Sequence, residues 1–217
     1  MKKSILFTSL LFGLLVTSCN ESENKDGDNA KVEVKEVENC IYTFNDANTK
    51  LDWTAYKFTR KAGVGGTFTK LQVDGKLKGA EVKKIIESLS FSIPTSTIET
   101  NDPSRNKKID SLFFNNLEST EMITGKVVSL GDDGNATLMI KMNNIEREVS
   151  GDYTLEDNKF TYKTEINLND WEAKKQLNTL NVACKDLHTD VENGETESVL
   201  WPDVSISFST ELSKACD

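Results

Sequence analysis

The chain has 217 residues and is acidic, with 35 Asp and Glu against 26 Lys and Arg and a formal net charge of −9. No stripe of basic residues is present to neutralise phosphates, which argues against a nucleic-acid partner. A single histidine and the lack of a C-x-x-C motif argue against a metal site, and the sequence holds no nucleophile elbow or glycine-rich phosphate loop. We therefore expect no cofactor and no catalytic residues, and a protein that is not an enzyme.

The N-terminus has the pattern of a lipoprotein signal. Residues 1–18 carry Lys2 and Lys3, then an apolar run and two small residues, as secretory signal peptides do. The apolar run is too short to span a bilayer core of about 30 Å at about 1.5 Å per helical residue. The letters VTSC at residues 16–19 resemble the bacterial lipobox, so we expect Cys19 to be the lipidated N-terminus. The alternative is an ordinary cleaved signal followed by an incidental cysteine.

Residues 19–39 are expected to form a disordered acidic tether. After Cys19 they hold seven acidic residues, three lysines and no aromatic residue, and so cannot bury enough apolar surface to offset the entropy of ordering. Residues 40–217 then have the size of one domain. Anchor and tether together predict a lipoprotein of a Gram-negative cell envelope, held at the outer membrane on its periplasmic or surface face.

The folded part has mainly strand patterns. Alternating apolar and polar residues, or apolar runs of strand length, occur at residues 51–58, 68–77, 88–93, 122–130, 136–142, 147–155, 160–168 and 204–209. Turn residues at 132–135 and 156–158 join neighbouring strands as hairpins, and Gly65-Gly66 suggests a tight bend or bulge. These features predict an all-β fold, an antiparallel barrel of about eight strands that closes on itself.

Two segments depart from the strand pattern. Residues 80–87 fit either a short helical turn or a continued strand. Asp102 can cap a helix and Pro103 suits its first position, which predicts a short helix whose apolar face lies near the barrel mouth. Residues 171–201 are polar and are interpreted as a long connection, in which the lone His188 is expected at the surface.

The cysteines predict one disulfide. Cys40 opens the first strand and Cys216 follows the last, so antiparallel pairing of these ends would bring the two thiols together. This pairing leaves Cys184 free. A bond between Cys40 and Cys184 stays open as the alternative.

Several motifs in the same order resemble the YceI-like family. Its central signature is similar to STIETNDPSR at residues 96–105, followed by Phe113-Phe114. The motif LDWTA at residues 51–55 with GGTF at 65–68 looks like the family's opening strand and turn. The strand ITGKV at 123–127 and the turn NNIEREV at 143–149 follow in the family's order, so the resemblance covers about residues 41–212.

The resemblance implies a lipocalin-like barrel whose apolar lumen holds an isoprenoid chain of the polyprenyl or quinone type, or another long-chain lipid. A barrel of about eight strands can hold one small ligand or be filled by its own side chains. The residues expected to line the lumen are Trp53, Phe68, Phe91, Ile93, Leu138, Ile140, Phe160 and Tyr162, with Phe113 and Phe114 near the mouth. Plain core packing is the alternative for each of them.

Arg105 is the headgroup candidate, because it is the arginine of the family signature and its planar fork suits phosphate. The alternative, favoured by the nearby Asp102 and Asp110, is a structural arginine that holds the helix-bearing loop. At the level of the whole protein, we expect a membrane-anchored barrel that sequesters or carries a lipid. The alternative is a non-catalytic envelope interaction protein with a packed barrel and functional loops. The sequence leaves the oligomeric state open.

Overall fold

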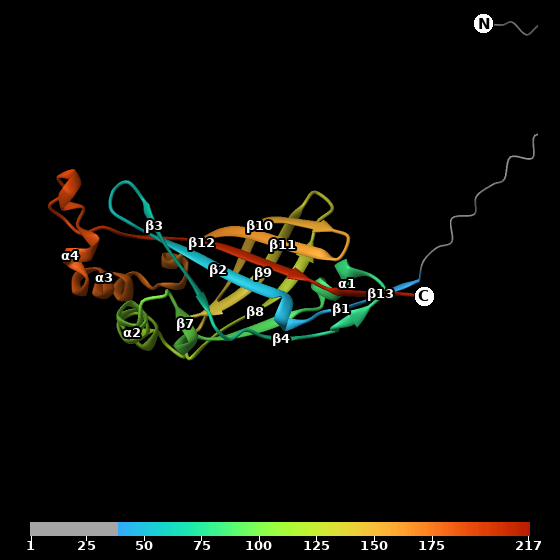
Figure 1. Cartoon of the computed structure of the whole chain (residues 1–217). Helices are drawn as coiled ribbons and strands as arrows, with labels where there is room; N and C mark the ends of the chain where they lie inside the picture. The colour runs from blue at the N-terminus through green and yellow to red at the C-terminus, as the bar shows by residue number, and fades with distance from the viewer. Residues whose placement is uncertain (1–38) are drawn as a thin grey trace, which may run out of the picture. The chain divides into compact units, whose positions relative to one another are not determined.

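The structure is a computed structural model that describes residues 39–217 (Figure 1). The expected signal peptide, the lipid anchor at Cys19 and nearly all of the expected tether lie outside the described residues. In the described part of the chain, no helix is both long enough and apolar enough to cross a membrane.

A curled antiparallel sheet of ten strands forms the wall of the fold. Its hydrogen-bonded order is β4 (Gln72–Asp74), β6 (Ser90–Pro94), β8 (Met122–Leu130), β9 (Asn135–Met142), β10 (Ile145–Glu156), β11 (Lys159–Asn167), β12 (Leu200–Glu211), β2 (Thr49–Lys57), β3 (Ala62–Phe68) and β7 (Ile98–Glu99). The meander from β8 to β12 is completed by β12 pairing with β2, so the last long strand lies beside the first. The predicted all-β, lipocalin-like architecture is confirmed.

Two details of the predicted barrel are wrong. The sheet curls without closing its hydrogen-bonded ring, because within residues 39–217 the edge strands β4 and β7 are not paired with each other. The strand expected over residues 68–77 is not continuous either. Phe68 ends β3, and the chain turns at Gly75, whose φ of 137° is accessible to glycine at little cost.

The two ends of the described part of the chain pair in a second, small sheet of β13 (Ser213–Cys216), β1 (Cys40–Thr43) and β5 (Lys78–Gly79). Cys40 and Cys216 are register partners and are joined by a disulfide, while Cys184 is free and buried. The first and last strands therefore pair as expected from the sequence, but outside the barrel wall.

Helices lie at both ends of the curled sheet. Their bounds are α1 (Val82–Glu87), α2 (Pro103–Leu112), α3 (Lys174–Ala183) and α4 (Lys185–His188), with 3-10 turns η1 (Asp46–Asn48), η2 (Thr95–Thr97), η3 (Phe114–Asn116), η4 (Leu168–Trp171) and η5 (Val191–Asn193). The open choice for residues 80–87 is thus settled as a helix. The predicted cap of α2 is present, because Asp102 Oδ1 accepts the backbone N–H groups of Ser104 at 2.9 Å and Arg105 at 3.0 Å. The long connection expected over residues 171–201 is confirmed, since it joins β11 to β12, but it holds α3, α4 and η5 and so is largely helical.

The buried side chains form two clusters. One joins α2, α3 and the ends of the strands next to them, around Phe113, Trp171 and Leu180. The other joins α1 to the disulfide end of the sheet, around Ile85 and Leu212. Leu138 of β9 packs against both clusters. Figure 1 shows α2, α3 and α4 at one end of the sheet and β1, β13 and α1 at the other. Residues 39–217 thus hold both cores and the disulfide within one compact unit.

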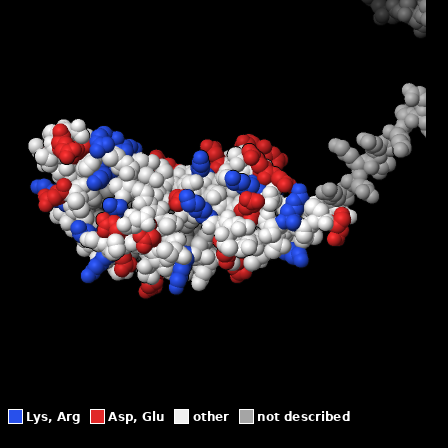
Figure 2. Space-filling model, viewed as in Figure 1, with Lys and Arg blue, Asp and Glu red and all other residues white. Residues whose placement is uncertain are grey.

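Charges of both signs are intermixed over the face seen in Figure 2, without a continuous basic stripe on that face. This surface agrees with the acidic composition of the chain and offers no track for a phosphate backbone.

Candidate functional site: a two-chamber lumen

A cavity of about 320 Å³, the mouth chamber, opens where α2, α3 and α4 meet the ends of the strands. Its wall is mainly aromatic and aliphatic, with contributions from α2 to α4 and from strands β2, β3, β8, β9, β11 and β12. Its polar lining lies chiefly on β2, around α2 and on α4: Lys57, Asp102, Ser104, Arg105, Lys108 and His188. The chamber is therefore apolar with a charged rim.

A second cavity of about 150 Å³, the deep chamber, lies further along the inside of the sheet toward the disulfide end. Its wall consists of Leu, Ile, Val, Phe, Met and Trp side chains, to which only Thr164 and Tyr162 add a hydroxyl. Tyr162 is buried, and burial raises the pKa of its phenol. This chamber has no charged lining residue.

Six residues line both chambers and mark the level at which they meet. We call them the belt; each comes from a different strand: Trp53, Phe68, Ile123, Met142, Ile166 and Ile206. The two chambers are thus successive parts of one apolar lumen.

All ten residues expected to line the lumen do line it. Phe113 and Phe114 border the mouth chamber, Trp53 and Phe68 belong to the belt, and the other six border the deep chamber: Phe91, Ile93, Leu138, Ile140, Phe160 and Tyr162. Their part in binding a ligand stays a prediction.

Glycines of neighbouring strands make room for two of the lumen aromatics. Trp53 and Gly66 are register partners, and a Cβ on Gly66 would stand 2.2 Å from Trp53 Cζ2. Phe91 and Gly125 are paired in the same way, with 2.4 Å to Phe91 Cζ. The rings therefore lie against the backbone of the wall. The bend or bulge expected at Gly65-Gly66 is wrong, because β3 runs through both residues. The lack of a side chain on Gly66 instead lets the Trp53 ring lie close to the backbone of β3.

The rim of the mouth chamber is enriched in cationic groups. Lys57 Nζ donates to the carbonyl oxygen of Leu187 at 2.8 Å. Burial lowers the pKa of Lys57, and the charges of Arg105 and Arg60 lower it further. The contributions of Arg105 and Arg60 reflect positive charges close to the Lys57 ammonium.

Arg105 lies at the rim rather than inside the fold. Its Nη2 is 3.6 Å from Asp102 Oδ2, and both side chains are nearly half exposed, so this ion pair is loose. The loop is held instead by the Asp102 carboxylate capping α2, and the backbone N–H of Arg105 lowers the pKa of that carboxyl. The guanidinium of Arg105 is thus available at the chamber mouth.

His188 also lies at the rim, and its expected surface position is wrong. Its side chain is half-buried and lines the mouth chamber. Asn181 donates its amide to Ser198, so the Asn181 oxygen accepts the Nδ1–H of His188 at 2.9 Å. Burial lowers the pKa of His188 to about 4, with smaller contributions from the charges of Lys57 and Lys108. His188 is therefore neutral at pH 7.

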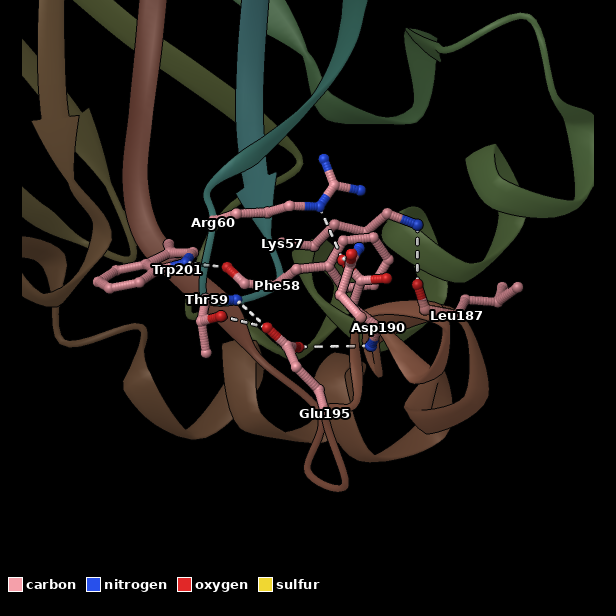
Figure 3. A network of polar contacts seen from close by, with 9 residues as sticks. Lys57, Phe58, Thr59, Arg60, Leu187, Asp190, Glu195 and Trp201 are labelled. Atoms are coloured by element: carbon pink, nitrogen blue, oxygen red, sulfur yellow. Dashed lines mark hydrogen bonds and ion pairs between the residues drawn. The ribbon is translucent and has the colours of Figure 1, made fainter.

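The segment 185–195 is fastened to the tip of the β2–β3 hairpin by the contacts in Figure 3, which we call the hairpin network. Arg60 Nε donates to Asp190 Oδ2 at 2.7 Å, and Glu195 accepts the backbone N–H of Thr59 at 2.8 Å as well as its hydroxyl. Trp201 Nε1 donates to the carbonyl of Phe58 at 2.7 Å, where the backbone has a positive φ of 64°. These contacts hold α4 and η5 over one side of the mouth.

Sequence reasoning missed the helical wall of the mouth chamber. Leu177, Leu180 and Cys184 line it from α3 and the residue after it. Their spacing of i, i+3 and i+7 is typical of a helix face and could have revealed it. Lys57 was also missed, although alternation along β2 places it on the same face as Trp53 and Ala55.

A further hollow, on the polar face of the sheet, is less suited to binding an apolar ligand. A hollow of about 510 Å³ lies on β4, β6, β8 and β9, lined mostly by the polar residues that alternate with the lumen-facing ones, such as Ser92, Thr124 and Lys126. Across residues 39–217, no three His, Cys, Asp or Glu side chains gather in a way that could hold a metal ion.

Solved structures share this fold. A polyisoprenoid-binding domain from Saccharophagus degradans, implicated in plant cell wall breakdown, matches with a TM-score of 0.56 and 12% identity, over 81% of this chain and 98% of that one. BcnA from Burkholderia cenocepacia matches with a TM-score of 0.52 and 14% identity, over 79% of this chain and 99% of that one. At such identities the likeness shows the fold alone. No curated protein sequence matches the chain.

The family comparison is more direct. The YceI-like domain matches residues 42–212, which is nearly all of the described part and includes every strand of the curled sheet. The chain therefore belongs to the YceI-like family.

Proposed function

We propose that this protein binds an isoprenoid lipid in its lumen and thereby sequesters or carries a polyprenyl or quinone-type molecule. The observation that carries the proposal is the two-chamber lumen, apolar along its length and charged only at its rim. An isoprenoid chain has no hydrogen-bonding groups, so a wall without charges suits it. Each Å² of apolar chain removed from water contributes roughly 25 cal/mol.

The rim supports a polar or anionic headgroup. Lys57, Arg105 and Lys108 border the mouth chamber, whereas Asp102 is the acidic residue among its lining. A guanidinium and two ammonium groups would be well matched to a phosphate. Arg105 is thus proposed as a headgroup ligand rather than as a structural arginine.

The alternative of a packed, loop-functional barrel remains the rival. A fully packed interior holds few voids larger than a water molecule, whereas this lumen holds about 320 Å³ and about 150 Å³. The cavities favour the binding role.

We also propose that Cys19 is acylated and holds the domain at the outer membrane of a Gram-negative envelope. An unmodified Cys19 in the intact mass of the mature protein would contradict this.

Uptake of farnesol and farnesyl monophosphate by residues 39–217 tests the binding role. Ala55 of β2 lines the mouth chamber, and Ala55→Phe should fill part of it and weaken both ligands at least tenfold. Thr54→Phe is the matched control, because the neighbouring residue of a strand faces the opposite side of the sheet. Truncating Phe91 or Phe160 should mainly change the ligand capacity.

The same titration tests the headgroup assignment. Arg105→Gln should weaken farnesyl monophosphate at least tenfold, in line with about 1.5 to 3 kcal/mol for a hydrogen bond to a charged group, and leave farnesol unchanged. If no ligand binds, and if truncation of Phe91 or Phe160 only destabilises the fold, the packed-barrel alternative replaces the proposal.

A further inference from the structure

The two chambers meet at the belt, and Trp53 is its largest member. Trp53 Nε1 donates to the carbonyl oxygen of Thr67 at 3.3 Å, which fixes the orientation of the indole. The ring is pressed against Gly66 so closely that a single methyl group there would collide with Cζ2, Cε2 and Cη2. The position of the indole thus depends on two features: its hydrogen bond to Thr67, and the lack of a side chain on Gly66, which lets the ring lie against β3.

Phe68, the other aromatic of the belt, is held by its neighbours. It contacts Phe114 edge-on with ring centroids 6.0 Å apart, and Phe114 contacts Phe113 at 5.1 Å. The aromatic side of the belt is thus held by specific contacts, and the other members are three isoleucines and one methionine from β8, β9, β11 and β12.

We infer that Trp53, held flat by Gly66, is the specificity-determining residue that sets how far an apolar chain enters the lumen. The indole lies at the level where a mouth chamber of about 320 Å³ meets a deep chamber of about 150 Å³. A chain seated with its headgroup at the rim fills the mouth chamber first and reaches the deep chamber only by passing the indole. The ring position therefore selects ligands by chain length. This inference rests on the proposed lipid-binding function.

A substitution at Gly66 changes the position of the Trp53 ring without changing Trp53 itself. In Gly66→Ala, the new Cβ would collide with the indole of Trp53. The backbone of β3 is held in the sheet, so the indole is the group that has to move. We expect the ring to move away from β3 and toward the lumen, which the indole lines. Gly65 offers a matched control on the same strand, since a Cβ there meets its nearest atom, the carbonyl oxygen of Trp53, at an ordinary 3.8 Å.

The test measures binding of geraniol, farnesol and geranylgeraniol, which carry two, three and four isoprene units, to residues 39–217. Trp53→Ala should join the chambers and shift the preference toward geranylgeraniol by about tenfold. Gly66→Ala should shift it toward geraniol by a similar factor, and Gly65→Ala should match the native protein. Thermal unfolding of each variant shows whether it folds, and Trp53→Leu replaces Trp53→Ala if the latter does not.

Opposite shifts in the Trp53 and Gly66 variants support the inference. Binding of all three alcohols with the same length preference in every folded variant overturns it and leaves the lipid-binding function in place. Failure of the native protein to bind any of them overturns both.

Discussion

His188 links the electrostatics of the rim to the stability of the fold. Its pKa in the folded protein is about 4, below its ordinary value of 6.5, so the unfolded chain binds the proton more readily than the folded one. Stability is therefore highest above about pH 6.5 and falls as the pH falls from there toward about 4. Below that window both states are protonated and His188 adds no further change.

Urea unfolding at a series of pH values checks this expectation. The native domain should lose stability on going from about pH 6.5 to about pH 5, where ordinary carboxylates are still ionised. His188→Gln, which keeps a group able to donate to the Asn181 oxygen, should flatten that part of the profile. If the unfolding free energy falls equally steeply with decreasing pH in the variant and in the native domain, a titratable group other than His188 causes the loss of stability.

Single residues also show what sequence reasoning can and cannot reach. Alternation along β2 places Trp53 and Leu51 on the lumen face, because side chains of a strand point to opposite sides in turn. The role of Gly66 depends on which residue of the next strand lies opposite, and spacing along one strand does not contain that register. For the same reason, the role of Gly125 opposite Phe91 could not be predicted from the sequence.

At the scale of elements, the hairpin network determines how firmly α4 and η5 cover the mouth. Asp190 is buried, accepts hydrogen bonds from Arg60 and Asn193, and has a pKa lowered chiefly by the Arg60 bond. Asp190→Ala should release the segment 185–195 and raise its amide exchange by about tenfold, because its local closing contacts are lost. Exchange in the long strands of the sheet should stay unchanged.

Hydrogen exchange followed by peptide mass spectrometry makes this comparison. Glu192→Gln, an exposed position in the same 3-10 turn, is the control and should exchange like the native protein. Equal exchange of residues 185–195 in the Asp190 variant and the native protein would mean that packing of Leu180 and Cys184, and not the network, holds the segment.

The elements differ in how readily their sequences reveal them. The helix α2 is announced by an aspartate cap and a proline at its first position, both local signals. The helix α3 has no capping side chain, and its apolar stripe is narrow, because most of its remaining residues are polar and exposed. The strands β4, β5 and β7 hold only two or three residues each, too few for an alternation to be recognised.

At the scale of the whole molecule, the disulfide ties the first and last strands of residues 39–217 together at the end of the sheet away from the mouth (Figure 1). It joins residues 176 positions apart, so it removes much entropy from the unfolded chain. Replacing both Cys40 and Cys216 with Ser should cost about 2 to 5 kcal/mol of unfolding free energy. Farnesol binding below the unfolding transition should be unchanged.

Denaturant unfolding with and without a reductant measures this cost. The reductant should destabilise the native domain and have no effect on the double Ser variant. Cys184→Ala, which removes the buried free thiol, should remain sensitive to the reductant. If the native domain is equally stable with and without the bond, the small sheet of β1, β5 and β13 already holds the ends by itself.

The order of motifs along the chain was enough to predict the lipocalin-like barrel, since each strand motif has a fixed neighbour in such a meander. Closure could not be predicted in this way, because it depends on whether the edge strands β4 and β7 pair with each other and not on any local pattern. Whether a lumen stays open is decided by cross-strand pairs such as Trp53 with Gly66. The open lumen is consequently a finding of the structure.

The most direct test of lipid binding is native mass spectrometry of residues 39–217 purified from the expression host, followed by organic extraction of whatever is bound. The lumen predicts a stoichiometric long-chain isoprenoid, whose class the extract would identify. An empty protein that also takes up neither polyprenyl nor quinone lipids would contradict the account and favour the packed, loop-functional interaction protein.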